Sequence, residues 1–406
     1  MQTNFNLSSF IKTYVTKRQE SLLQADFGKY NNELNQRING KTVMVIGGAG
    51  TIGSYFIKAL LKFNIAKLVV VDINENGLTE LVRDLRSSGD YNIPADFITY
   101  PVNFGDRVFE KIFRENGPFQ IVANFAAHKH VRSEKDIFSI EAMIENNVLR
   151  ARRLLDLLLE SPPEHFFCVS TDKAANPVNI MGASKKLMEE LIMAYADRLP
   201  IKTARFANVA FSNGSLPLGF LERLNKQQPW SCPFGIRRFF VSPEESGELC
   251  LMACIMGESG DIFYPKLDEK RDMIPFDQIA IDLLKVLGFE PDIYQTEDEA
   301  KQQAKLMSSK TKKYPVYFFG SDTSGEKSYE EFFTDDEVLD NDSFINLGIV
   351  KNSKRRSIEE IDLIFLQLMT LFEKQNISKA DIVGIIKNYL SNFSHIEKGL
   401  NLDQKM

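Results

Sequence analysis

The stretch Gly47-Gly48-Ala49-Gly50-Thr51-Ile52-Gly53 decides the fold of this chain. It follows the apolar run Thr42–Ile46 and leads into a segment with apolar residues at helical spacing, at positions 56, 59, 60 and 63. A glycine-rich turn between a strand and a helix lets backbone amides approach a pyrophosphate, and the helix N-terminus favours the negative charge. We therefore expect a tight turn at Gly47 and Gly50 and a helix that packs closely at Gly53.

Further apolar runs continue this pattern along the chain. Stretches long enough for crossover helices separate Leu68–Val71, Phe97–Tyr100, Ile121–Phe125, Phe166–Val169 and Thr203–Phe206. Six strands in such an alternation predict an α/β fold, a Rossmann-type doubly wound parallel sheet. A simple joint between strand and helix is the alternative reading of the glycine turn, but the surrounding alternation favours a nucleotide site.

The pattern weakens beyond Ser212, which predicts a smaller C-terminal substrate lobe. Glycine- and proline-containing loops there mix with short runs such as Ile262–Tyr264 and Val316–Phe319. Helical spacing at the start and two capping patterns near the end, Ser357 with Glu360 and Ser378 with Asp381, predict added terminal helices. We predict a helical N-terminal extension (1–40), a nucleotide-binding domain (41–211), a substrate lobe (212–345) and a helical C-terminal extension (346–406).

Composition excludes several classes of protein. The 406 residues are 44% hydrophobic and 26% charged, as in an ordinary globular protein, so intrinsic disorder is excluded. The 49 Lys and Arg against 55 Asp and Glu give a net charge of −6, without the basic stripe that a nucleic-acid partner requires. No apolar run approaches the roughly 20 residues of a membrane span. The four cysteines form no CxxC pair, so we expect reduced thiols and a cytoplasmic protein.

Asp72 points to the identity of the cofactor. It ends the second predicted strand, nineteen residues past Gly53. A carboxylate at that position accepts hydrogen bonds from an adenosine ribose and repels a 2′-phosphate, and the following Ile73–Asn76 offers no cation to neutralise that phosphate. The sequence therefore favours NAD over NADP.

Three motifs carry a family resemblance: Asn124–Val131 (NFAAHKHV), Ser170–Pro177 (STDKAANP) and Met181–Lys186 (MGASKK). With the GxxGxxG turn, they resemble the extended short-chain dehydrogenase/reductase superfamily, and within it the UDP-N-acetylglucosamine 4,6-dehydratases of bacterial polysaccharide synthesis. The resemblance covers roughly residues 41–335. It implies that the following residues hold NAD: Gly47, Gly50, Thr51, Ile52, Gly53, Asp72, Asn103, Phe104, Ala126, Ala127 and Lys185.

The resemblance also implies a reaction that is redox-neutral overall. A hydride leaves C4 of the sugar for the cofactor, water is lost across C5 and C6, and the hydride returns to C6. The product is a 4-keto-6-deoxy sugar nucleotide. This chemistry needs an acid for the departing hydroxyl, a base at C5 and a cofactor that stays bound.

Thr171-Asp172-Lys173 supplies candidates for those roles because it directly follows a predicted strand, where ligands of such folds bind. Asp172 is the candidate acid and Lys173 the candidate base, provided that burial shifts their pKa values. A turn cap is the alternative role for Asp172. Lys185 matches the lysine of the superfamily, but Met181 stands where the superfamily usually has tyrosine. A thioether cannot accept the C4 hydroxyl proton, which leaves Asp172, Lys185 or a water on Thr171.

The resemblance implies a further set of substrate contacts: Lys129, His130, Asn208, Arg238 and Glu326. Asn208 could donate to a phosphate or the base, Arg238 could hold a diphosphate in bidentate fashion, and Glu326 could accept from a ribose hydroxyl. A solvated loop is the alternative for Lys129 and His130. The His128–His130 pair lacks a third ligand, so we expect no metal.

We conclude from the sequence that the protein is a nucleotide-sugar 4,6-dehydratase acting on UDP-N-acetylglucosamine or a close relative. A nucleotide-sugar epimerase shares the fold, the cofactor and the keto intermediate, but Asp172-Lys173 favours elimination. A non-catalytic protein that binds NAD and uses its extensions for partners is the alternative outside enzymes. We also expect a homo-oligomer, since such folds commonly pair through long helices.

Overall fold

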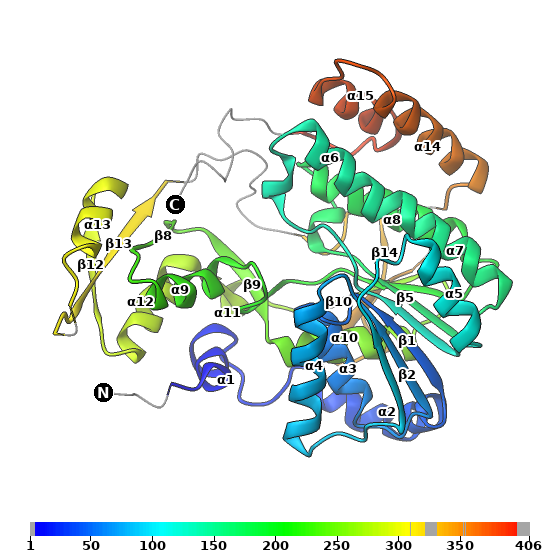
Figure 1. Cartoon of the computed structure of the whole chain (residues 1–406), viewed down its shortest axis with the longest axis horizontal. Coiled ribbons are helices and arrows are strands. Elements are labelled where there is room, and N and C mark those ends of the chain that lie inside the picture. The colour runs from blue at the N-terminus through cyan, green and yellow to red at the C-terminus, as the bar shows by residue number, and fades with distance from the viewer. Residues whose placement is uncertain (1–4, 309, 321–330, 352, 354, 396–406) are drawn as a thin grey trace.

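The computed structural model describes residues 5–308, 310–320, 331–351, 353 and 355–395. Figure 1 shows a large sheet domain beside a smaller lobe, with helices from both ends of the chain packed against them. No helix of these described ranges is long and apolar enough to cross a membrane.

Within the described ranges, nine strands form the large sheet, in the order β14-β15-β10-β6-β5-β4-β1-β2-β3. The strands from β3 to β10 run parallel, whereas β15 and β14 are antiparallel to their neighbours. This confirms the predicted doubly wound sheet. The strands are β1 Thr42–Ile46, β2 Lys67–Val71, β3 Asp96–Tyr100, β4 Ile121–Asn124, β5 His165–Val169, β6 Ile201–Ala204, β10 Asp261–Pro265, β14 Val338–Asp340 and β15 Leu347–Lys351.

Helices cover both faces of this sheet (Figure 1). Helix α10 packs against α3 and α2 on one face, and α7 and α8 pack together on the other. The 3₁₀ segments η2 and η4 and the π-helix η3 flank them. The bounds are α2 Gln24–Ile38, α3 Thr51–Leu60, α4 Glu75–Ser88, α5 Arg107–Asn116, η2 Val131–Glu134, α6 Ile137–Ile144, η3 Glu145–Leu149, α7 Arg150–Glu160, η4 Asp172–Ala174, α8 Ile180–Ala194 and α10 Pro243–Met256.

The smaller lobe contains two three-stranded sheets, β11-β9-β7 and β12-β13-β8. Its core surrounds the buried Trp230 and includes residues of the N-terminal helix α1 and π-helix η1. The elements are α1 Leu7–Phe10, η1 Ile11–Val15, β7 Asn208–Val209, α9 Leu216–Asn225, β8 Trp230–Pro233, β9 Arg237–Val241, α11 Glu269–Asp272, β11 Met273–Pro275, α12 Phe276–Val286, β12 Glu290–Tyr294, α13 Glu297–Ala304 and β13 Lys313–Phe319.

One expected lobe segment lies elsewhere. Ile262–Tyr264 forms part of β10 and extends the large sheet beside β6, because Ile262 and Phe263 are buried there in the main core. Val316–Phe319 does lie in the lobe, within β13. After the first lobe strands the chain therefore returns to the sheet domain, which contains α10, β10, β14 and β15.

The predicted tail helices are confirmed with their caps. Helix α14 (Ile358–Phe372) begins at a capping box of Ser357 and Glu360, and α15 (Lys379–Tyr389) begins at one of Ser378 and Asp381. Both helices pack outside the sheet, with α14 against α8 (Figure 1).

Candidate functional site

The glycine turn has the close backbone approaches that its sequence predicts. Gly47 has a φ of +76°, and a Cβ atom there would lie 2.5 Å from the amide nitrogen of Ala126. A Cβ atom on Gly53 would lie 2.3 Å from the carbonyl oxygen of Gly47. Larger residues would thus separate β1 from α3 or from the end of β4.

A cavity of about 210 Å³ opens beside this turn, at the carboxyl ends of β1, β2 and β4. Its wall contains most of the predicted cofactor residues, namely Gly47, Gly50, Asp72, Asn103, Phe104, Ala126 and Ala127. The predicted Thr51 lies elsewhere: its hydroxyl oxygen accepts a hydrogen bond from the backbone amide of Asn213, 2.9 Å away. The predicted residues on this wall come from four segments, which thus meet at one edge of the sheet.

Asp72 contributes to the shape of the turn as well as to the cavity. Its carboxylate accepts hydrogen bonds from the amides of Ala49 and Asn74, each at 2.9 Å. Arg150 also lines this cavity, and its guanidinium pairs with Glu145 at 3.3 Å. No local sequence pattern identifies Arg150, because it enters from a helix more than 70 positions past Asp72.

A second cavity, of about 230 Å³, adjoins the first, and both are lined by Phe125 and Ala127. The structure brings together here most of the residues predicted for catalysis and substrate binding. They are Lys129, His130, Thr171, Asp172, Lys173, Met181, Lys185 and Asn208. Ile52, predicted to contact the cofactor, also lines this second cavity.

Thr171, Asp172 and Lys173 form a compact turn at the end of β5. The Oδ1 atom of Asp172 accepts hydrogen bonds from the Thr171 hydroxyl at 2.7 Å and from the Lys173 amide at 2.9 Å. The Nζ atom of Lys173 lies 3.0 Å from the same oxygen. Asp172 is 3% exposed. The hydroxyl of Thr171 and the ammonium of Lys173 are therefore each within direct proton-transfer distance of the buried carboxylate of Asp172.

Lys185 and Met181 face the same cavity from α8. The Nζ atom of Lys185 donates to the carbonyl oxygen of Val169 at 2.6 Å, and burial lowers the pKa of this lysine. The first turn of α8 lies directly on the Asp172 turn, since a Cβ atom on Gly182 would lie 2.6 Å from the carbonyl oxygen of Lys173. The Met181 amide donates to Glu134 Oε1 at 2.9 Å. Glu134 is a second residue that the sequence did not identify.

A buried charge network supports the Asp172 turn from behind. Glu189 accepts hydrogen bonds from the Ser170 hydroxyl at 2.5 Å and from Arg205 at 2.8 and 2.9 Å, and Arg205 also pairs with Glu337. Burial raises the pKa of Glu189, but the charge and hydrogen bonds of Arg205 outweigh it, so the net pKa is lowered. Only the spacing of Glu189 from Lys185, one helical turn, could have suggested this role.

The predicted substrate residues have different environments. Asn208 Nδ2 is buried and has no hydrogen-bond partner in the part of the chain that the structure describes. Arg238 is 6% exposed on β9, and its guanidinium donates to the Arg237 carbonyl oxygen at 2.9 Å. It is not among the described residues that line the second cavity. Glu326 lies outside the described residues.

Asn147 connects the loop after β4 to α8. Its side chain exchanges hydrogen bonds with the backbone of His128, at 2.8 and 2.9 Å, and donates to the Ser184 hydroxyl at 3.0 Å. This holds in place the loop that carries Lys129 and His130. No group of three or more His, Cys, Asp or Glu side chains suited to a metal ion occurs among the residues with described positions.

Relatives share most of this chain. It is 30% identical over 317 residues to the uncharacterized membrane protein MJ1061 of Methanocaldococcus jannaschii, covering 76% of this chain and 85% of that one. It is 28% identical to a UDP-glucose 4-epimerase of Rickettsia massiliae, covering 90% and 94%. It is 26% identical to the capsular polysaccharide biosynthesis protein CapD of Staphylococcus aureus, covering 85% of this chain but only 54% of that one, so this chain spans about half of CapD.

A solved structure has the same fold. The structure of Pen from Bacillus thuringiensis superposes with a TM-score of 0.61 at 20% identity, covering 82% of this chain and 99% of that one. The sequence model of the polysaccharide biosynthesis protein family matches residues 43–352. That range includes the described lining residues of both cavities, from Ile46 to Ser215, and exceeds half of the chain, so the chain belongs to the family of polysaccharide biosynthesis proteins.

Proposed function

We propose that this protein is an NAD-dependent nucleotide-sugar-modifying enzyme of polysaccharide or glycan synthesis, specifically a 4,6-dehydratase acting on UDP-N-acetylglucosamine. One observation carries the proposal: two cavities adjoin at Phe125 and Ala127, one beside the glycine turn and the other beside Asp172 and Lys173. A dinucleotide and a sugar can therefore occupy adjoining spaces, with acid–base groups on the sugar side.

The first cavity fits a dinucleotide. The absence of Cβ atoms at Gly47 and Gly53 brings the start of α3 close to the end of β4, and the helix N-terminus favours a pyrophosphate. Asp72 in this cavity suits a ribose, and Lys185, on the wall of the adjoining second cavity, suits the ribose next to the nicotinamide. When bound, NAD supplies a hydride acceptor and donor, so that the sugar is oxidised and reduced without a second substrate.

The Asp172 turn supplies the proton transfers of an elimination. Lys173 removes the proton from C5, and Asp172 protonates the hydroxyl that departs from C6. Their side chains lie 3.0 Å apart. Asp172 receives its proton from the C4 hydroxyl through Thr171, and Lys173, acting as the neutral amine, returns its proton to C5 when the hydride returns to C6, so both groups end each turnover as they began it. Because Met181 has no exchangeable proton and Lys185 donates to Val169, we assign the C4 hydroxyl proton to the Thr171 hydroxyl backed by Asp172.

The lobe side of the cavity supports a sugar-nucleotide substrate. Asn208 Nδ2 is a buried donor without a partner in the described structure, so an acceptor on a ligand would satisfy it. Lys129 and His130 line the same cavity and suit a diphosphate. The names of the relatives, a capsular polysaccharide biosynthesis protein and a UDP-glucose 4-epimerase, agree with this substrate class. Arg238 and Glu326 stay predictions from the family resemblance.

The test is to incubate the purified full chain with NAD and UDP-N-acetylglucosamine and record proton NMR spectra. A new C6 methyl signal is expected, and the Asp172→Asn and Lys173→Ala variants should lose it while they still retain NAD. Lys301→Ala, an exposed lysine of α13 outside both cavities, is the matched control and should behave as wild type. Normal turnover by either site variant would remove that residue from the mechanism.

An epimerase is the second candidate, favoured by the similarity to the Rickettsia enzyme over 90% of this chain. It would invert a ring carbon without forming a methyl group, so the same spectra separate the two activities. A protein that binds NAD and changes no sugar nucleotide in a panel would instead be non-catalytic.

A further inference from the structure

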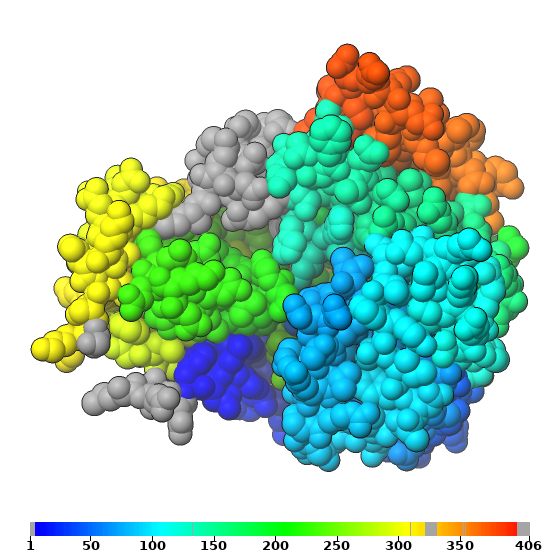
Figure 2. Space-filling model, viewed as in Figure 1, coloured from blue at the N-terminus to red at the C-terminus, as the bar shows by residue number. Residues whose placement is uncertain are grey.

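The N-terminal segment 5–23 is built into the lobe although it lies outside the family range of residues 43–352. Phe10, Ile11 and Val15 are each at most 3% exposed and belong to the same hydrophobic core as Trp230. Figure 2 shows this segment, in dark blue, between the green part of the lobe and the blue part of the sheet domain. The segment therefore packs between the lobe and the sheet domain.

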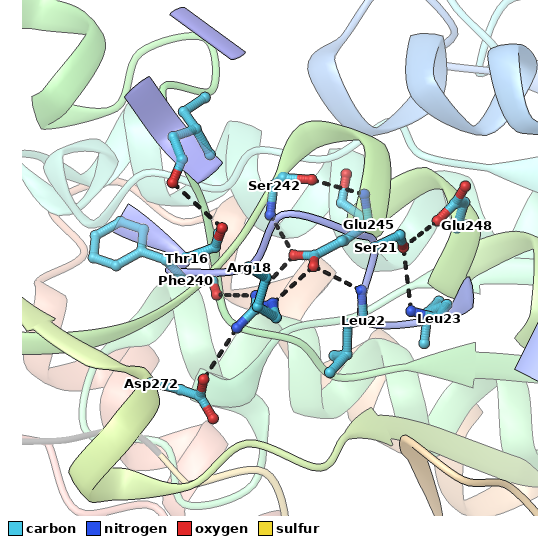
Figure 3. A network of polar contacts seen from close by, with 12 residues as sticks. Thr16, Arg18, Ser21, Leu22, Leu23, Phe240, Ser242, Glu245, Glu248 and Asp272 are labelled. Atoms are coloured by element: carbon cyan, nitrogen blue, oxygen red, sulfur yellow. Dashed lines mark hydrogen bonds and ion pairs between the residues drawn. The ribbon is translucent and has the colours of Figure 1, made fainter. Parts of the chain in front are cut away.

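Arg18 makes the charged contact of this segment (Figure 3). Its Nε and Nη2 atoms each lie 2.8 Å from a carboxylate oxygen of Glu245, and Nη1 lies 3.1 Å from Asp272 Oδ1. Nη2 also donates to the carbonyl oxygen of Phe240 at 3.1 Å. The Glu245 and Asp272 side chains are 3% and 1% exposed, and Arg18 pairs with Glu245 while it shares Asp272 with Arg271, whose Nη2 atom lies 2.8 Å from Asp272 Oδ2. A planar guanidinium can make all of these contacts at once, whereas an ammonium cannot.

The partners of Arg18 belong to different parts of the fold. Glu245 closes the capping box of α10, and α10 packs so tightly on α3 that a Cβ atom on Gly247 would lie 2.2 Å from the Tyr55 backbone. Asp272 directly precedes β11, which pairs with β9, and Phe240 lies in β9 itself. Arg18 thus connects the sheet domain to two neighbouring strands of the lobe.

These lobe strands lead to the substrate cavity. Phe240 is the register partner of Asn208 in the pairing of β9 with β7. Asn208 lines the cavity, and its Nδ2 atom has no hydrogen-bond partner among the residues that the structure describes. The hydrogen bond from Arg18 to the Phe240 carbonyl therefore fixes the strand directly beside Asn208. A shift of this strand by a fraction of an ångström would move a buried donor out of hydrogen-bond range.

The same segment holds a second piece of the cavity wall. Phe10 packs edge-to-face on Phe211, with ring centroids 5.8 Å apart. Phe211 has a φ of +54°, a strained conformation for a bulky residue that surrounding contacts must maintain. It begins a loop whose Ser212, Gly214 and Ser215 line the cavity. Both contacts of the segment thus end at the lobe wall of the cavity.

We propose that residues 5–23 are a strap that positions the lobe wall of the substrate cavity, with Arg18 and Phe10 as its positioning residues. The contacts of Arg18 and Phe10 given above involve no residue of the Asp172 turn or of the glycine turn. Loosening it should therefore weaken binding of the sugar nucleotide and leave the chemical step nearly intact. The inference rests on the proposed function for the identity of the ligand.

The experiment measures the Kd of UDP and of UDP-N-acetylglucosamine by calorimetry, and kcat and KM from product formation, on full-length protein. Arg18→Ala should raise Kd and KM about tenfold and change kcat less than about threefold, and Arg18→Lys should fall between it and wild type. Arg37→Ala is the matched control, because Arg37 of α2 contacts Ile255 and Glu33 at the other end of the sheet. It should leave Kd, KM and kcat unchanged.

Phe10→Leu tests the strap without removing a charge and should raise KM in the same direction. Circular dichroism and thermal unfolding identify any variant that fails to fold, and in that case Arg18→Lys and Phe10→Leu decide. Unchanged Kd and KM in folded variants, or a loss confined to kcat, would overturn the inference. If wild-type protein binds neither UDP nor UDP-N-acetylglucosamine, the proposed function fails instead.

Discussion

The two terminal extensions contact different segments next to the substrate cavity, and they do so with different chemistry. The N-terminal strap reaches the lobe wall through the Arg18 guanidinium and the Phe10 ring. The C-terminal extension reaches the turn before α8, where Asn392 Nδ2 donates to the Ala175 carbonyl oxygen at 2.9 Å and the Ser394 amide donates to that of Pro177 at 3.1 Å. The family core thus carries the proposed reactive groups, and each extension fixes a different wall around them.

The different positions of these two contacts predict different kinetic effects when each contact is changed. The lobe wall carries Asn208, a proposed substrate contact, whereas the turn before α8 carries Asp172 and Lys173, the proposed acid and base. We therefore expect changes at the N-terminal strap to alter KM and changes at the C-terminal contact to alter kcat.

Among the predictions for the C-terminal contact, a substitution of Glu134 should have the largest effect on kcat. Its carboxylate accepts from the Met181 amide at 2.9 Å and lies 3.8 Å from His395 and 4.0 Å from Lys379. Removing a buried charged acceptor costs about 1.5–3 kcal/mol. We expect Glu134→Ala to lower kcat for UDP-N-acetylglucosamine roughly tenfold to a hundredfold, measured by steady-state kinetics.

Glu134→Gln is the matched control, since its amide oxygen can still accept from the Met181 amide. It should lose less activity than Glu134→Ala. A rise in KM at constant kcat would contradict the separation between the two walls.

A substitution of His165 tests whether function is confined to the end of the sheet that carries Asp172. It lies at the opposite end of β5, 3.3 Å from the Nζ atom of Lys202, and burial with the charges of Lys202 and Arg37 lowers its pKa to about 3. Between pH 6.5 and 3 the unfolded chain therefore binds a proton that the folded chain does not, so stability falls as the pH falls. At pH 5 this destabilises the wild type by about 2 kcal/mol relative to pH above 6.5.

The measurement is urea unfolding of wild type and His165→Gln at pH 7 and pH 5. The variant should lose about 2 kcal/mol less stability between the two values and should keep the wild-type KM. Equal losses in both proteins would show that His165 is protonated in the fold.

Much of the fold could be predicted because the central strands are buried on both faces. Such strands appear in a sequence as continuous apolar runs, and β1 has the predicted bounds Thr42–Ile46. The segment Ile262–Tyr264 was assigned to the lobe because its partner β6 precedes it by more than 50 positions, with lobe elements between them. Pairing across an inserted lobe leaves no local signal.

The candidate site divides in the same way. Gly47, Asp72 and Asp172 follow strands directly, and the topology of a parallel sheet gathers such residues at one edge. Arg18, Glu134 and the Arg205–Glu189 pair instead reach the site through packing between distant segments. In the sequence these charged residues resemble ordinary surface residues, because only the tertiary structure shows that they are buried.

Asn392 gives a smaller and more local break in the C-terminal contact. Asn392→Ala removes one neutral hydrogen bond, to the Ala175 carbonyl, worth about 1 kcal/mol. We expect kcat to fall about fivefold with KM unchanged, measured by the same kinetics. Asn35→Ala is the matched control, since among the described residues that side chain bonds within α2 and to its C-cap, at Asn31 and Asn39.

Combining Asn392→Ala with Arg18→Lys tests whether the two terminal extensions act independently of each other. The two residues share no partner in the described structure, and changes at independent sites add to within about 0.5 kcal/mol. The loss of kcat/KM in the double variant should therefore equal the product of the two single losses within about a factor of two. A larger coupling would mean that the lobe wall and the Asp172 turn move as one unit, so that the two extensions act on a single closure of the cavity rather than on separate walls.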